Sequence, residues 1–149
     1  MKKILFSSVV LTFFTVSMIA FQLSCSKQSI AQITNSKAYT IEGLWVGTYL
    51  SNTTTSSSQF FSLSVKQDGT LICDSKGAGK QYLCIGTWAL SGSNFTSDIS
   101  NVWSEIGISN VTQHLTATYD STTGKLTNGT WQNTSFYPAS GTFNLTEVE

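Results

Sequence analysis

The stretch IEGLWVGTY, residues 41–49, opens the first predicted strand and ends in a Gly-Thr-aromatic motif. The motif occurs four times, as Gly47-Thr48-Tyr49, Gly86-Thr87-Trp88, Gly129-Thr130-Trp131 and Gly141-Thr142-Phe143. Alternate residues of a strand point to the same face, so the glycine and the aromatic ring of each copy share a face. Glycine leaves room there for a neighbouring ring or for sharp coiling. We therefore predict strongly curved strands that close on themselves and leave no free edge.

The rest of the chain after residue 40 has the same antiparallel β pattern. Short alternating apolar runs are separated by Gly, Asn, Asp and Ser, and no segment carries an apolar stripe of helical period. Asp68-Gly69 is a strong signal for a two-residue hairpin turn. The segment 101–110 is less regular and is expected to form a long loop, an extra short strand or a lid. Strands are predicted near 41–50, 59–66, 70–75, 81–90, 94–100, 111–119, 125–132 and 140–147.

The N-terminus has the pattern of a secretory signal. Lys2 and Lys3 precede an apolar run over 4–21, and a small residue followed by Cys25 ends it. This ending resembles the lipobox of bacterial lipoproteins. Polar residues interrupt the run, which argues against a permanent membrane span of about 20 apolar residues. An uncleaved anchor helix and ordinary secretion with cleavage near Ala31 are the alternative interpretations.

The lipoprotein resemblance implies a domain organisation and a compartment. Residues 1–24 would be a signal peptide, 25–40 a tether carrying lipid on Cys25, and 41–149 the folded domain. Several acyl chains, at ~0.8 kcal/mol per buried methylene, would anchor the protein stably to a membrane. We expect the protein to be located in the bacterial cell envelope, anchored to the outer membrane on either its periplasmic or its surface face.

Lipid on Cys25 would leave two cysteines, Cys73 and Cys84. They flank residues 76–80, KGAGK, a predicted hairpin loop, and the midpoint between the two cysteines falls inside this loop, so they are expected to lie opposite each other on paired strands. A disulfide is the natural expectation in an oxidising compartment. A reactive or metal-binding pair is the alternative, although one histidine and no third thiol make a zinc site unexpected.

Composition argues against several classes of function. The chain has 8 basic and 8 acidic residues, and every basic residue is lysine, so nothing favours nucleic-acid binding. The single histidine, His114, shares a strand face with Thr112 and Thr116 and is interpreted as solvated. The acidic residues are scattered, and no nucleophile elbow or P-loop occurs. We predict no enzyme, no cofactor and no metal.

The Gly-x-Trp at Gly43–Trp45 resembles the opening of lipocalin and avidin-like barrels, the calycin group. Residues 68–71, 86–92 and 124–127 extend the likeness to the lipocalin-like domains of lipoproteins found in Bacteroidetes, over about 41–147. The resemblance implies a structural role for Trp45 and a cavity open at one end. The predicted fold class is all-β: an antiparallel up-and-down β-barrel of about eight strands after an N-terminal lipoprotein signal peptide.

Two functions remain in competition. The first is binding of a small apolar or amphipathic ligand inside the barrel, and the candidate lining is Tyr49, Phe61, Trp88, Phe95 and Trp131. The alternative interpretation is that these rings are structural and fill the core. The second function is a protein-interaction or inhibitor module, similar to small barrels that inhibit lysozymes. It would act through the Lys76–Lys80 hairpin or the segment 101–110 on a partner protein that the sequence does not identify.

Overall fold

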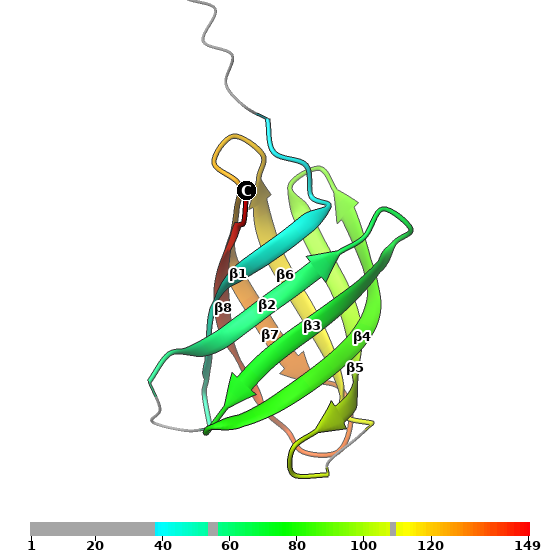
Figure 1. Ribbon diagram of the computed structural model, residues 1–149, viewed down its shortest axis with the longest axis vertical. Coiled ribbons are helices and arrows are strands. Elements are labelled where there is room, and N and C mark those ends of the chain that lie inside the picture. Colours follow the sequence, from blue (N-terminus) through cyan, green and yellow to red (C-terminus); the bar gives the residue numbers. More distant parts are fainter. Residues whose placement is uncertain (1–37, 54–56, 108–109) are drawn as a thin grey trace, which may run out of the picture. The chain divides into compact units, whose positions relative to one another are not determined.

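Eight antiparallel strands close on themselves in the order of the sequence (Figure 1). The computed structural model describes residues 38–53, 57–107 and 110–149. Each strand pairs with its sequence neighbours, and the first also pairs with the last, which confirms the predicted all-β, up-and-down barrel. The strands are β1 (Gly43–Ser51), β2 (Gln59–Val65), β3 (Thr70–Gly77), β4 (Lys80–Ser91), β5 (Asn94–Ser104), β6 (Thr112–Asp120), β7 (Lys125–Asn133) and β8 (Ser140–Glu147). The residues described contain no helix that is long and apolar enough to cross a membrane.

The strand β5 is longer than the sequence pattern predicts. It continues to Ser104, so the first four residues of the irregular segment 101–110 belong to the sheet. Cys84 pairs with Asn101 and Leu83 with Trp103, which leaves one extra residue on β5 at a bulge. A bulge shifts the alternation of inward and outward residues, and this shift obscured the strand in the sequence.

The glycines of the repeated motif lie where neighbouring strands approach closely. A Cβ on Gly86 would lie 2.0 Å from the carbonyl oxygen of Asp98, and one on Gly47 would lie 2.1 Å from that of Asn144. Both contacts are with backbone, which cannot swing aside as a flexible side chain can. Glycine at these positions therefore permits the tight coiling that closes the barrel.

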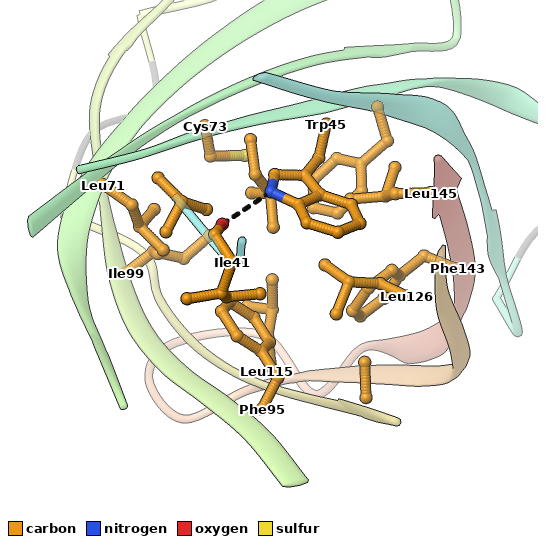
Figure 2. Packing of buried hydrophobic residues seen from close by; sticks show 14 of the residues in the cluster. Ile41, Trp45, Leu71, Cys73, Phe95, Ile99, Leu115, Leu126, Phe143 and Leu145 are labelled. Atoms are coloured by element: carbon orange, nitrogen blue, oxygen red, sulfur yellow. Dashed lines mark hydrogen bonds between the residues drawn. The ribbon is translucent and has the colours of Figure 1, made fainter. Parts of the chain in front are cut away.

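One end of the interior is filled by a hydrophobic core. Trp45 is completely buried, and its indole nitrogen Nε1 donates a hydrogen bond to the carbonyl oxygen of Ile41 at 2.8 Å (Figure 2). The ring of Tyr119 packs edge-on against Trp45, with centroids 5.9 Å apart. Figure 2 shows further core side chains converging around Trp45 from several strands: Leu71, Ile99, Phe95, Leu115, Leu126, Phe143 and Leu145.

The chain that precedes β1 covers this filled end. The Tyr39 backbone N–H donates to the Ser121 carbonyl at 2.8 Å, and the Tyr119 hydroxyl donates to the Tyr39 carbonyl. The Tyr39 ring lies against Gly124. Residues 38–40, predicted as the end of a tether, are thus packed on the barrel. Cys25 and the predicted signal peptide lie outside the described residues.

The close approach at Gly86 can be tested by adding a single methyl group. We expect Gly86→Ala to lower the free energy of unfolding by about 1–3 kcal/mol, because the new Cβ forces the β4 and β5 backbones apart. Urea unfolding followed by tryptophan fluorescence measures the change. Thr87→Ala, one residue away on the exposed outer face, is the control and should stay within about 0.5 kcal/mol of the parent. Equal effects of the two substitutions would contradict a role for Gly86 in coiling.

Candidate ligand-binding cavity

The opposite end of the barrel interior contains a cavity of about 300 Å³. It opens to solvent beside Tyr137, whose residue surface is 70% exposed. Its walls come from seven of the eight strands together with the β3–β4, β5–β6 and β7–β8 connections. The lining residues are Tyr49, Ser51, Gln59, Phe61, Ser75, Gly77, Ala78, Tyr82, Cys84, Asn101, Val111, Gln113, Trp131, Asn133, Tyr137 and Ala139.

Three of the five aromatic residues predicted to line a cavity do so. Tyr49 packs edge-on against Phe61, with centroids 5.7 Å apart, and against Trp131, with centroids 6.0 Å apart. The Trp131 indole nitrogen donates to the Leu50 carbonyl at 3.1 Å, which holds this ring in place. The three rings thus form one connected aromatic wall supplied by β1, β2 and β7.

Trp88 and Phe95 are not among the lining residues, which corrects the prediction for these two. They stack on each other with centroids 6.5 Å apart and an interplanar angle of 19°, and Phe95 is fully buried. The Trp88 indole nitrogen donates to the Lys66 carbonyl at 2.8 Å, beside the β2–β3 turn of the filled end. Alternation places both residues on the inner face of the barrel but does not reveal their height along its axis.

Amide side chains line the cavity, and the sequence analysis did not identify them. Gln59 accepts two hydrogen bonds at Oε1, from the Tyr49 hydroxyl at 2.9 Å and from the Ala78 backbone N–H at 3.1 Å. On another wall, Gln113 Nε2 donates to Asn133 Oδ1 at 2.9 Å, and Asn133 Nδ2 donates to the Tyr137 carbonyl at 2.8 Å. Strand alternation places these amides on the inner face of β2, β6 and β7, and this was the sequence signal that could have identified them.

The cavity carries no lysine, aspartate or glutamate on the walls that the structure describes. The nearby ion pair between Lys80 Nζ and Glu105 Oε1, at 3.8 Å, involves two side chains that do not line the cavity. Burial, together with the neighbouring Tyr82 and Cys73, raises the pKa of Tyr49 to about 12. The Tyr49 hydroxyl is therefore protonated at neutral pH and acts as the donor to Gln59.

Cys73 and Cys84 are directly opposite each other on β3 and β4, as predicted. Both are buried, Cys84 lines the cavity, and the structure records both as free thiols. The pKa of the Cys73 thiol is raised well above its ordinary value, mainly by its hydrogen bond with Cys84 and secondly by burial. The described residues contain no group of three metal-ligating side chains around the pair. The disulfide itself stays a prediction.

The other residues singled out in the sequence lie away from the cavity or only at its rim. His114 Nδ1 is 2.7 Å from Asp98 Oδ1, and neither side chain lines the cavity. The Lys76–Lys80 hairpin is a tight turn with positive φ at Ala78 and Gly79, and it adds only Gly77 and Ala78 to the lining.

Comparison with family models, with curated proteins and with solved structures gave no match to this chain. The fold and the cavity therefore define its class directly: a small eight-stranded antiparallel barrel, filled at one end and hollow at the other.

The raised pKa of Tyr49 predicts a loss of stability in alkali. An unfolded tyrosine releases its proton near pH 10, whereas the folded Tyr49 keeps it until about pH 12, so folding is progressively disfavoured between these values. We expect Tyr49→Phe to lose less free energy of unfolding than the parent over this interval. Denaturant unfolding of both proteins at a series of pH values measures their free energies of unfolding. The other tyrosines are present in both proteins, so their titration cancels when the two free energies are subtracted. Parallel pH profiles for the two proteins would contradict the prediction.

The opposed cysteines predict a disulfide in protein isolated from an oxidising compartment. Peptide mapping without reduction should give a Cys73–Cys84 cross-linked peptide, and reduction should lower the free energy of unfolding by about 3 kcal/mol at most, because the closed loop is short. Full alkylation of both thiols in unfolded, unreduced protein would exclude the disulfide.

Proposed function

We propose that this protein is a lipid-anchored envelope protein whose barrel binds a small apolar or amphipathic ligand. The observation that carries the proposal is the cavity at the open end, which combines an aromatic wall with a few convergent amide groups. Its volume of about 300 Å³ lies at the lower end of the range of ligand pockets, roughly 300–1,000 Å³. A mainly apolar lining with few polar groups is typical of such pockets.

The rings of the aromatic wall are held in position without a ligand. Trp131 is fixed through its bond to the Leu50 carbonyl, and Tyr49 through its bond to Gln59. A preformed site reduces the loss of conformational entropy on binding, so more of the contact energy is realised as affinity. This supports ligand binding over a cavity that simply remains from imperfect packing.

The membrane anchor rests on the sequence. The lipobox-like ending at Cys25 supports lipidation of this residue and attachment of the protein to the outer membrane. A lipidated Cys25 would not form a disulfide with a cysteine of the barrel. The proposal includes no catalytic step and no cofactor, since the cavity walls that the structure describes bring no acid and base together.

A second candidate function is a protein-interaction module, favoured by the β7–β8 connection. Phe136 and Tyr137 are 74% and 70% exposed on this loop, and Phe136 has a φ of +62°. Exposed aromatic side chains on a loop are typical anchors of protein interfaces. The loops named in the sequence analysis, the Lys76–Lys80 hairpin and the segment 101–110, remain predicted contact sites, the first as a tight turn and the second with residues 101–104 in β5.

Native mass spectrometry of the intact protein, purified in detergent from its own host, tests ligand binding. We expect an adduct that survives gentle ionisation and is lost on denaturation. Ser75→Phe, which places a ring in the cavity, should abolish the adduct, whereas Ser91→Phe on the exposed end of β4 should retain it. Thermal unfolding of both variants verifies that they fold.

A clean apoprotein mass for the parent would contradict ligand binding. Capture of a partner that is lost on joint substitution of Phe136 and Tyr137 by alanine would then establish the interaction module instead.

A further inference from the structure

We infer that the ligand of the cavity is an uncharged molecule with a flat ring that carries both a hydrogen-bond acceptor and a hydrogen-bond donor. The inference rests on the proposed function, because it names the ligand class of the same site.

The absence of charge follows from the cavity walls. None of the lining residues that the structure describes is lysine, aspartate or glutamate, and the chain contains no arginine. A buried ion without a counter-charge is strongly disfavoured. A carboxylate or an ammonium group would therefore have to remain outside the cavity, which leaves an uncharged ligand as the one that can enter fully.

The orientation of the Gln59 amide is determined by its partners. The Ala78 backbone N–H can only donate, so the atom facing it must be the amide oxygen, and that oxygen also accepts from the Tyr49 hydroxyl. The Gln59 NH₂ group is left with no acceptor among the residues that the structure describes. This side of the cavity thus offers a donor, which an acceptor on the ligand would satisfy.

The Gln113 amide is oriented by a chain of two bonds. The Tyr137 carbonyl can only accept, so Asn133 must turn its nitrogen toward it and its oxygen toward Gln113. Gln113 consequently presents its nitrogen to Asn133, and its own oxygen has no donor among the described residues. This side of the cavity offers an acceptor, which a donor on the ligand would satisfy.

The two glutamines come from opposite walls. In the closed order of eight strands, β2 and β6 are four positions apart in either direction, so Gln59 and Gln113 extend into the cavity from facing sides. A ligand between them must therefore carry an acceptor and a donor at once. A hydrocarbon in this place would leave both amide groups unsatisfied, at a cost for each.

The flat ring follows from the aromatic wall. The Tyr49 hydroxyl and the Trp131 indole nitrogen already donate their hydrogens, to Gln59 and to the Leu50 carbonyl, so these residues offer the ligand mainly ring surface and no free donor. Tyr49 packs edge-on against both Phe61 and Trp131. An aromatic ring in the cavity can extend the same edge-to-face array.

Three probes of the same ring system test the inference on the intact protein in detergent. They are 2-naphthamide, which is uncharged and has a donor and an acceptor, 2-naphthoate, which is an anion, and 2-ethylnaphthalene, which is apolar. Isothermal titration calorimetry measures the three dissociation constants. We expect the amide to bind about tenfold more tightly than either of the other two, the factor that one net hydrogen bond supplies.

A pair of matched substitutions assigns the preference to the cavity. Gln113→Met replaces an amide by an apolar side chain of similar length and should abolish the preference for 2-naphthamide over 2-ethylnaphthalene. Gln132→Met makes the same change on the exposed outer face of β7 and should leave the preference unchanged.

The outcomes distinguish this inference from the proposed function. Tightest binding of 2-ethylnaphthalene or 2-naphthoate, or an unchanged preference in Gln113→Met, would overturn the ligand class and leave ligand binding intact. No binding of any of the three probes would also overturn the ligand class, and the native mass spectrum of the parent protein would then decide separately whether the barrel binds another ligand.

Discussion

The pairing of β1 with β8 is the constraint on which the rest of this structure depends. It joins the ends of the sheet along the register from Trp45–Glu147 to Ser51–Gly141, so no strand is left with an unpaired edge. Closure forces every strand to coil, and the coiling brings neighbouring backbones so close at Gly47 and Gly86 that no side chain fits. It also gives the barrel an inside, into which every second side chain points.

That interior is divided along its axis into two parts of different character. At one end, Trp45 is fixed by the Ile41 carbonyl and surrounded by aliphatic and aromatic residues, and the chain around Tyr39 covers them. At the other end, small residues such as Ser75 lie among rings and amides, and part of the space between them is unfilled. The filled end supplies the burial that stabilises the fold, so the hollow end can hold polar side chains around an open space.

The polar groups of the hollow end are arranged by hydrogen bonds whose directions are determined. Backbone atoms at Ala78 and Tyr137 orient Gln59 and Asn133, and Asn133 in turn orients Gln113. Each glutamine uses one end of its neutral amide in these hydrogen bonds and presents the other end to the cavity. Gln59 thus offers a donor and Gln113 an acceptor. A site of this kind can recognise a ligand by hydrogen bonding in a low-dielectric space without a buried charge.

The sequence by itself determined the strands, apart from the last four residues of β5, their antiparallel connection and the opposition of Cys73 and Cys84, because alternation and turn residues are local properties of the chain. The repeated Gly-Thr-aromatic motif predicted the closure into a barrel. The sequence also identified Tyr49, Phe61 and Trp131 as inward rings. Only the tertiary structure decided that Trp88 and Phe95 stack in the core and that Gln59 and Gln113 face each other across a cavity. The physical reason is that a period of two residues specifies the face on which a side chain lies. Its height along the barrel axis, and the neighbours it meets across the interior, depend on the stagger of strands that pair only when the barrel is closed.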